Sequence, residues 1–459
     1  MSTYLNIYIT TLSRYFLGIF LILYCVLGIT LLIRDDPDYD NSVLLHAQSV
    51  CMFLFSFTAF LCISSVTGDT RIMLYFFIEQ VLMIGIIVIG SILYPDANRL
   101  FGNNMCMLLS VGFVILTRLN VNKSLKQLLI VTVSFIVSMG VPLIIRRIRL
   151  LYTLKWIYAS IGIGALGAVL IAGQITYGAN ISYTIGGITF QPSEIIKIVF
   201  VFFVASCFVR ARGLNEVLIS ASIAVVHVLI LVLSRDLGSA LIYGVVYLVM
   251  VFVATGNILY LLGGGAAAFA AALVAYQRFA HVRTRVQAWL DPWSTIDDTG
   301  YQITQSLFAI SSGSTWGLGL MKGNPASIPF VEDDFVFSAV VEEMGFVVGI
   351  SLLVICLLSF LASIRLAAAL SSMYYRLLAV GLGTSYIFQV FVTVGGGVKF
   401  IPLTGVTLPF VSYGGSSVLT SILLFEVLMG VSMIRMDEEI FYEKINEHNE
   451  GTRDKSIQS

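Results

Sequence analysis

Long apolar runs separated by short polar connections are the dominant pattern of this chain. About thirteen of the runs reach the roughly 20 residues that a helix needs to cross a bilayer. They lie near 13–33, 47–67, 73–93, 102–119, 126–145, 152–173, 191–210, 213–233, 236–255, 257–275, 335–358, 373–396 and 408–434. The pattern predicts an all-α polytopic membrane protein whose connections carry most of the polar chemistry.

One polar interval is much longer than the other connections. It begins at Arg278, contains several arginines near its start, and ends in Glu332, Asp333 and Asp334. Irregular backbone cannot face lipid, because its N–H and C=O groups would lack hydrogen-bond partners there. The interval therefore lies on a membrane face or in a protein-lined cavity, and we expect the chemistry in it.

Composition agrees with the membrane assignment. Hydrophobic residues make up 58% of the chain and charged residues 11%, with a mean hydropathy of +0.94, whereas soluble proteins are about a quarter charged. The formal net charge is zero, and no basic tract indicates nucleic-acid binding. All six cysteines lie in apolar runs without a CxxC pair, which favours small core residues over disulfides or metal ligands.

Orientation follows from the basic residues of short connections, which favour the cytoplasm. The most basic short connection carries Arg146, Arg147, Arg149 and Lys155. Counting from it places the N-terminus, the connection 174–190 and the long interval outside, and the C-terminus inside. The basic residues between 118 and 126 then lie outside, against the simple rule. The polar tail after Arg435 is expected to be solvated or disordered.

Charged residues inside spans are costly and therefore candidates for function. Glu194 and Lys197 are three residues apart and share a helix face. Two interpretations remain open: a salt bridge that neutralises itself and packs helices, or the polar wall of a substrate cavity in which Lys197 meets phosphate. Arg235 is interpreted as an inside-facing anchor, and Asp236 as a helix cap.

Asp334 directly precedes an apolar run, so its carboxylate is expected at the rim of a span. Partial burial near Glu332 and Asp333 would raise its pKa and suit it as a general base. The alternative is an acidic residue that merely caps the helix. Arg283 and Arg285 suit bidentate phosphate binding, or else anchor the loop to lipid headgroups.

A Gly/Pro-rich interruption, 395–417, precedes the last span. Broken backbone at membrane depth is tolerated only where it lines a cavity or packs in protein. Lys399 stands beside the break and suits an anion. Side chains able to hydrogen-bond a ligand follow it: Thr404, Ser412, Tyr413, Ser416 and Ser417.

Four ordered motifs carry a resemblance to a known family. They are QPSEIIK, RDLGSALIY, the run from AWLDPW through GYQITQSLFAISSGSTWGLG to DDFVFSAVVEEMGFVVG, and IPLTGVTLPFVSYGGSS. Together they resemble the SEDS proteins, the shape, elongation, division and sporulation family of RodA, FtsW and SpoVE. The resemblance covers roughly residues 101–435.

The resemblance implies a fold and a function. SEDS proteins are bundles of about ten transmembrane helices with one large extracellular loop, here 276–334. The core is then 101–435, with 1–100 an additional segment of about three spans and 436–459 a cytoplasmic tail. The family implies a peptidoglycan glycosyltransferase of the bacterial plasma membrane that polymerises lipid II into glycan strands outside, beside a class B penicillin-binding protein.

The resemblance also implies roles for individual residues. Asp334 matches the essential carboxylate of the family's TDF-like motif, which here begins with Asp333 instead of threonine. Matches to the family's cavity and loop residues are Glu194, Lys197, Arg285, Gln302 and Gln305. Arg283, Lys399 and Tyr413 join them as substrate-binding candidates from their own positions. Two further departures are Ser-Arg before Asp236 and the stretch from Gly178 to Tyr183.

These residues predict a mechanism. Apolar spans accept the polyprenyl tail, cationic side chains neutralise the diphosphate, and Asp334 takes a proton from the acceptor hydroxyl. No cofactor is required by the pattern, although a divalent cation, Mg²⁺ or Mn²⁺, at the diphosphate stays open.

Two other functions remain as alternatives. A flippase or transporter of lipid-linked precursors would also have a buried Glu194–Lys197 pair and broken helices, and a non-enzymatic scaffold is compatible with the sequence. The dense polar constellation outside the membrane and the lack of an internal repeat argue against transport. The sequence does not distinguish elongation, division and sporulation.

Overall fold

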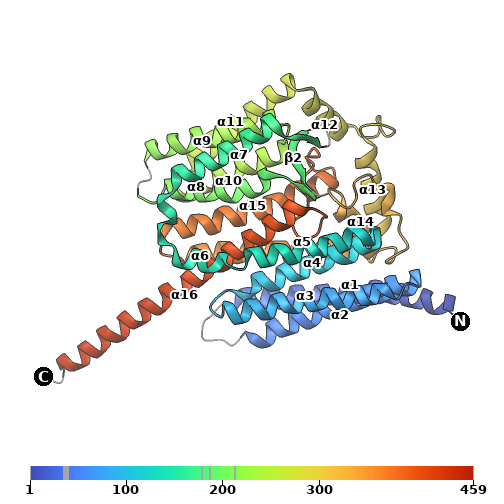
Figure 1. Cartoon of the computed structure of the whole chain (residues 1–459), viewed down its shortest axis with the longest axis horizontal. Coiled ribbons are helices and arrows are strands. Elements are labelled where there is room, and N and C mark those ends of the chain that lie inside the picture. Colours follow the sequence, from blue (N-terminus) through green and yellow to red (C-terminus); the bar gives the residue numbers. More distant parts are fainter. Residues whose placement is uncertain (1, 35–40, 177–178, 186–187, 211–212, 458–459) are drawn as a thin grey trace.

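Helices dominate the computed structural model, which describes residues 2–34, 41–176, 179–185, 188–210 and 213–457 (Figure 1). The first part of the chain forms α1 (Ser2–Ile33), α2 (Ser42–Thr67), α3 (Arg71–Leu93), α4 (Arg99–Leu119), α5 (Val121–Ser138), α6 (Val141–Arg147), η1 (Arg149–Thr153) and α7 (Lys155–Ala172). The remainder forms α8 (Pro192–Cys207), α9 (Leu214–Leu233), α10 (Leu237–Thr255), α11 (Ile258–Arg278), α12 (Ala280–Leu290), α13 (Tyr301–Gly313), η2 (Pro325–Ser327), α14 (Val336–Ala369), α15 (Met373–Gly397) and α16 (Gly415–Ile457).

Within the described residues, eleven candidate spans are long and apolar enough to cross a membrane. One of them joins α5 and α6, which are separate helices on either side of Gly140. The shorter helices α7 and α8 fill the remaining two positions of the sequence pattern. The predicted all-α polytopic fold is therefore confirmed. The six cysteines are free and buried, as expected of core residues.

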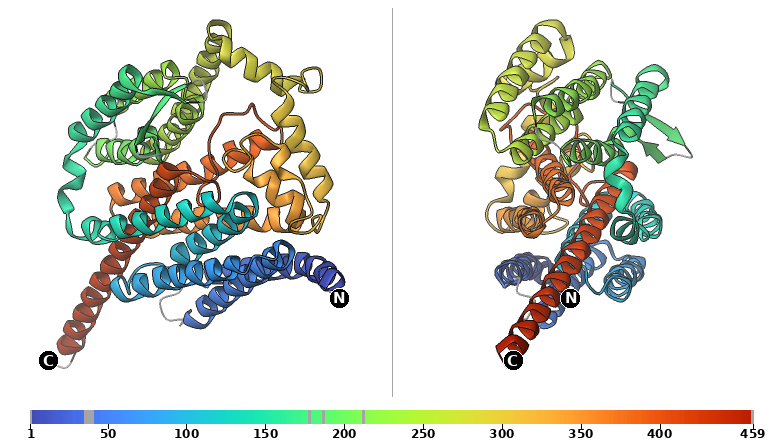
Figure 2. Two further views of the ribbon diagram at one scale, coloured as in Figure 1. Left: turned by 45° about the vertical axis from the view of Figure 1, so that its right-hand side comes forward. Right: turned by 90° about the vertical axis from the view of Figure 1, so that its left-hand side faces the viewer.

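Helices α1–α3, here called the N-terminal helices, form a layer along one side of the bundle (Figures 1 and 2). They pack on α4 and α14, while α7–α11 lie on the opposite side of the bundle. The chain's N-terminus and α13 lie at one end of the bundle, the α13 end, and α6 lies at the other, the α6 end. This agrees with the count of spans, which placed the N-terminus and the long interval on the same side.

The connection 174–190 is not a plain loop. It contains a small antiparallel sheet of β1 (Gln174–Thr176), β2 (Ala179–Ile185) and β3 (Ile188–Phe190), in the order β1-β2-β3. Tyr183 pairs with Phe190 and Ile185 with Ile188. Of the stretch that departs from the SEDS pattern, Gly178 lies outside the described residues.

The long interval is also more regular than expected, since α12, α13 and η2 form within it. Its segment after α13 packs into a break in α14, where Gly345 has φ 88° and ψ 171°. Backbone N–H groups of Leu318 and Gly319 donate to the carbonyls of Glu342 and Glu343, at 2.9 Å each. The groups freed by the break are thus paired inside the protein, as a membrane protein requires.

The tail that was expected to be solvated or disordered is helical over most of its length. Helix α16 continues from the last span to Ile457 and projects beyond the α6 end (Figure 1). The start of the tail is stabilised by an ion pair between Arg435 and Glu439, which are one helical turn apart; Arg435 Nε lies 2.8 Å from Glu439 Oε1. Asp437 also accepts a hydrogen bond from Arg146 at 2.6 Å, so the first turn beyond the span is fixed to α6.

Candidate functional site

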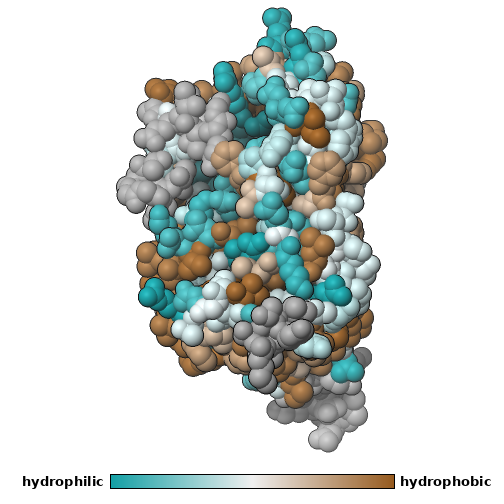
Figure 3. All heavy atoms as spheres, turned by 90° about the vertical axis from the view of Figure 1, so that its right-hand side faces the viewer, coloured by the Kyte–Doolittle hydropathy of each residue, from teal (hydrophilic) through white to brown (hydrophobic). Residues whose placement is uncertain are grey.

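A cavity of about 610 Å³ opens toward the α13 end. Residues of α5, α8, α12, α13 and the start of α16 line it, together with the connection between α9 and α10 and the segments before α14 and before α16. Figure 3 faces this end and shows hydrophilic side chains gathered over the middle of a hollowed surface. The predicted Gly/Pro-rich interruption therefore lies where broken backbone is tolerated, in the wall of a cavity.

The main chain in front of Asp334 is clamped by the segment before α16. Tyr413 N–H donates to the Glu332 carbonyl at 2.8 Å, and the Ser412 hydroxyl donates to the Asp333 carbonyl. Gln127 of α5 donates to the Ser412 carbonyl at 3.2 Å. Two distant parts of the chain thus fix the position of the Asp334 carboxylate at the cavity.

Asp334 has the electrostatics expected of a general base. Protein surrounds it on the sides away from the cavity, and this burial raises its pKa to about 7. The neighbouring Asp333 carboxylate raises the pKa further, while the Arg285 guanidinium lowers it. Asp334 is thereby held near the protonation equilibrium at neutral pH, where a base is most effective.

Arg285 faces Asp334 across Gly405. A Cβ added at Gly405 would lie 3.7 Å from Asp334 Oδ2 and 4.0 Å from Arg285 Nη2, and the glycine has φ +77°. Arg285 Nη1 donates to the carbonyls of Leu403 at 3.3 Å and Thr404 at 3.0 Å. Burial lowers the pKa of Arg285, although guanidinium groups remain charged in proteins. The cavity therefore presents a base and a fixed cation side by side.

Glu194 lines the cavity, and Lys197 lies behind it. Lys197 Nζ donates to Glu194 Oε2 at 2.6 Å and to Gln389 of α15. The two interpretations of this pair combine: the ion pair packs α8 against α15, and its carboxylate is exposed to the cavity. Lys197 itself meets Glu194 and Gln389 in this arrangement.

The structure brings only part of the predicted set together. Asp334, Glu194, Arg285, Gln302 and Tyr413 line the cavity. Four other predicted residues are not among the described residues that line the cavity: Lys197, Arg283, Gln305 and Lys399.

Arg283 and Lys399 have other contacts in place of the cavity. The exposed Arg283 side chain donates to the Gln277 carbonyl at 3.0 Å and lies 6.0 Å from the Tyr276 ring centroid. Lys399 has φ 60°, and its carbonyl accepts from Trp289 Nε1 at 3.1 Å. Arg283 and Lys399 thus contact other parts of the protein and do not line the cavity.

Arg235 and Asp236 also line the cavity. Asp236 caps α10 as predicted, accepting from Ser239 N–H at 3.1 Å, and also accepts from Gln191 and Ser193 at 3.0 and 2.9 Å. Arg235 was interpreted as an inside-facing anchor and Asp334 as facing outside, but the connection between α9 and α10 lies at the Asp334 side of the bundle, so the two residues share one side. The backbone of Arg235 has φ 64°. In the sequence, the Arg-Asp pair directly before a helix that begins with small residues could have indicated that Arg235 belongs to the site.

His281 of α12 is a second residue that sequence reasoning passed over. Its pKa is lowered by burial and by the nearby charges of Arg235 and Arg285. The neutral imidazole is therefore favoured at pH 7. Its Nε2 is buried without a hydrogen-bond partner, which leaves a polar atom beside the two arginines.

Comparison with known proteins identifies the family. The model of the FtsW, RodA and SpoVE family, described as cell cycle proteins, matches residues 72–437. The chain belongs to this family. The match starts in α3, so it takes in one of the N-terminal helices as well as the core.

Individual relatives agree with this assignment. The chain is similar to the peptidoglycan glycosyltransferase RodA of Mycobacterium tuberculosis, with 36% identity over 56% of this chain and 58% of the relative. It is also similar to the probable peptidoglycan glycosyltransferase FtsW of Aliivibrio salmonicida, with 32% identity over 78% and 86% of the two chains. The chain thus spans little more than half the length of the mycobacterial RodA proteins.

Solved structures show the same fold. A chain from a peptidoglycan synthase complex that coordinates polymerization and crosslinking matches with a TM-score of 0.63 and 26% identity, over 74% of this chain and 98% of that one. The rod shape determining protein RodA of Thermus thermophilus matches with a TM-score of 0.57 and 25% identity, over 74% and 97%. The SEDS membership expected from the motifs is confirmed.

Proposed function

We propose that this protein is a peptidoglycan glycosyltransferase that polymerises lipid II at the outer face of the plasma membrane. The observation that carries the proposal is the half-buried Asp334, with its pKa near 7, beside Arg285 in a large cavity. The RodA and FtsW relatives are named as a peptidoglycan glycosyltransferase and a probable one, which supports the same class of reaction. In this proposal the α13 end is extracellular, because the basic connection at the α6 end favours the cytoplasm.

In the proposed reaction, Asp334 removes the proton from the C4 hydroxyl of the acceptor sugar. The hydroxyl oxygen forms the new bond to the anomeric carbon of the donor, and the bond to the lipid diphosphate breaks. Negative charge then develops on the departing diphosphate. Arg285 and Arg235, fixed in the cavity wall, stabilise that charge in surroundings of low dielectric.

Other cavity residues would bind and orient the two sugars. Gln302, Tyr413 and the hydroxyls of Ser416 and Ser417 supply hydrogen-bond donors and acceptors around the cavity. The polyprenyl tails would lie against apolar helix surfaces. Holding both lipid-linked substrates in one orientation supplies a large part of the acceleration, since it removes their translational freedom before the reaction.

A divalent cation at the diphosphate would be held mainly by the substrate. Among the described residues, no group of three or more His, Cys, Asp or Glu side chains is placed to hold a metal ion. A cation there would add charge stabilisation at the phosphate oxygens. The roles assigned to Asp334 and Arg285 stand with or without it.

The partner in this proposal is a class B penicillin-binding protein, which would crosslink the emerging strand. Support comes from the solved chain of similar fold, which belongs to a complex that coordinates polymerization and crosslinking. Each protein would then supply one of the two reactions at the same membrane surface.

The test is polymerisation of lipid II by the purified protein in liposomes, with and without a cognate penicillin-binding protein, and with moenomycin to silence class A polymerases. We expect glycan strands from the wild type and from Asp297→Asn, an exposed acid of the same loop used as the matched control. Asp334→Asn should yield none. Activity that survives in Asp334→Asn would assign the base to Asp333 or Glu332.

Absence of polymer from folded wild type with its partner would favour a transporter or a scaffold instead. Transport would be detected as movement of a fluorescent lipid II across the liposome bilayer. If the protein is a scaffold, the Asp334→Asn variant should assemble the complex as well as the wild type does.

A further inference from the structure

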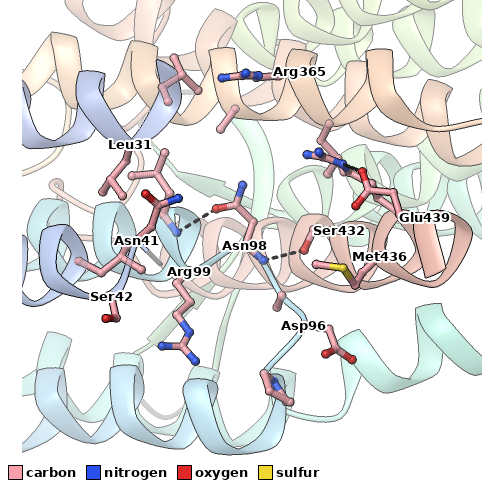
Figure 4. Close-up of a pocket in the computed structure, with 18 residues that line it drawn as sticks. Leu31, Asn41, Ser42, Asp96, Asn98, Arg99, Arg365, Ser432, Met436 and Glu439 are labelled. Atoms are coloured by element: carbon pink, nitrogen blue, oxygen red, sulfur yellow. Dashed lines mark hydrogen bonds and ion pairs between the residues drawn. The ribbon is translucent and has the colours of Figure 1, made fainter. Parts of the chain in front are cut away.

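A second cavity, of about 340 Å³, lies toward the α6 end, away from the proposed catalytic cavity, and shares no lining residue with it. It forms at the seam where the N-terminal helices meet the core (Figure 4). Its walls come from the end of α1, the start of α2, the start of α4, and the last turns of the α14 and α16 spans.

Three arginines from three helices line this seam cavity: Arg99 of α4, Arg365 of α14 and Arg435 of α16. Arg435 is paired with Glu439 at 2.8 Å. Arg99 is exposed and forms no hydrogen bond or ion pair with any residue that the structure describes. None of the described residues therefore takes up the donors of its guanidinium, which suit an anionic ligand.

Both acids among the described residues that line the seam cavity are already engaged. Glu439 pairs with Arg435, and Asp96 accepts from Arg146 at 3.0 Å. Helix α4 also begins in the cavity wall, and the positive end of its dipole adds to the arginines. An anion is the ligand that this balance of charge favours.

Apolar side chains form another part of the wall, which lies at the depth of the membrane surface. Leu31, Leu32, Leu45 and Leu366 line the cavity beside the arginines. The candidate span of α1 ends at Ile33 and that of α4 begins at Arg99, so the cavity is level with the ends of the spans. Lipid phosphates lie at this depth, and acyl chains lie just below it.

We propose that the seam cavity binds the phosphate group of an anionic glycerophospholipid from the leaflet at the α6 end. Its phosphate meets Arg99, with Arg365 in the same wall, and its acyl chains follow the leucines. Basic pockets between transmembrane helices bind anionic headgroups in this way. A lipid here bridges the N-terminal helices and the core, a role that is separate from polymerisation.

The test measures lipid retention by native mass spectrometry of the full-length protein released from phosphatidylcholine nanodiscs doped with phosphatidylglycerol. The wild type should retain phosphatidylglycerol in preference to phosphatidylcholine. Arg99→Gln should weaken this retention by about tenfold, because it removes a charge-assisted phosphate contact. Arg147→Gln, the same change at an exposed arginine of the α6 end outside the cavity, should leave retention unchanged.

Three results would overturn the proposal. Equal loss in Arg99→Gln and Arg147→Gln would mean that the lipid responds only to overall surface charge. Competition by inorganic phosphate or glycerol phosphate as strong as by the lipid would make the ligand a soluble phosphate. No preference for phosphatidylglycerol in the wild type would show that acidic side chains, including those of the sequence between α1 and α2, already neutralise the arginines.

Thermal unfolding in pure phosphatidylcholine controls for folding, since Arg99→Gln should there match the wild type. The assay does not depend on glycan synthesis, so its failure and a failure of the proposed polymerase are separate results.

Discussion

Asp333 and Asp334 are adjacent in sequence but differ in their surroundings. Asp334 has a pKa raised to about 7 by burial and by the Asp333 charge, with Arg285 acting in the opposite direction. A base must be ionised to act, so activity should rise as pH increases through this value. Removing the charge of Asp333 or of Arg285 should therefore shift the acid limb of the pH–rate profile in opposite directions.

The rate of lipid II polymerisation measured against pH should show an acid limb centred near pH 7. Asp333→Asn removes a like charge, lowers the pKa of Asp334, and should move the limb to lower pH. Arg285→Gln removes a favourable charge, raises that pKa, and should move the limb to higher pH as well as reducing the rate. A limb that stays at the same pH in both variants would mean that another group limits the rate.

At the scale of the elements, the break in α14 depends on one glycine. Gly345 has φ +88°, and a Cβ added to it would lie 2.3 Å from the backbone nitrogen of Gly317. Both the backbone strain and the contact would oppose a side chain there. The segment after α13 could then no longer pair with α14.

Gly345→Ala should therefore lower the free energy of unfolding by at least about 2 kcal/mol. The measurement is denaturation in detergent micelles followed by a structural probe. Gly85→Ala is the control, since a Cβ at this glycine in α3 meets nothing within 4 Å. Similar stabilities of the two variants would show that the break tolerates a side chain.

Two ion pairs near the long interval differ in burial: one joins α4 to α14, and the other joins α5 to Glu332 of the interval. Arg118 donates to Glu343 at 2.8 Å, with side-chain exposures of 16% and 0%, whereas Lys123 and Glu332 are 36% and 21% exposed. Removal of one partner from a buried pair leaves an uncompensated charge, but an exposed charge is solvated by water.

Glu343→Gln should thus cost about 3 kcal/mol of stability, and Glu332→Gln at most about 1 kcal/mol. Both variants make the same chemical change and are compared under the same denaturing conditions. Equal costs would mean that water reaches Glu343 as readily as Glu332.

At the scale of the whole molecule, buried polar contacts attach the N-terminal helices to the core. Asn104 of α4 accepts from the Tyr24 hydroxyl of α1 at 3.0 Å and donates to Ser359 of α14 at 3.0 Å. In the same interface, Ser110 donates to Glu79 at 2.9 Å. Such contacts set which helix faces meet, because apolar surfaces alone do not distinguish a neighbouring helix from lipid.

Asn104→Leu should lower the unfolding free energy by about 1 kcal/mol, since it leaves the Tyr24 hydroxyl without its acceptor. Thermal unfolding in nanodiscs measures the effect. Asn122→Leu, at an exposed position near the start of α5, is expected to change stability less. A larger loss in Asn122→Leu would contradict the importance of the Asn104 contacts.

The sequence alone determined the membrane class, the order of the apolar helices, and the family. Lipid requires long apolar segments, and each such segment can be recognised without knowing its neighbours. Asp334, Arg285 and Glu194, which the family resemblance assigned to the cavity and its loop, line one cavity in the structure.

The tertiary structure decided which polar groups converge and which only support them. Lys197, Arg283 and Lys399 carry charges suited to phosphate, yet their side chains lie outside the cavity lining, whereas Arg235 lines it. Spacing along a helix fixes the face of a residue, but the element opposite that face depends on packing between distant segments. For the same reason, the raised pKa of Asp334 and the seam cavity follow only from the assembled bundle.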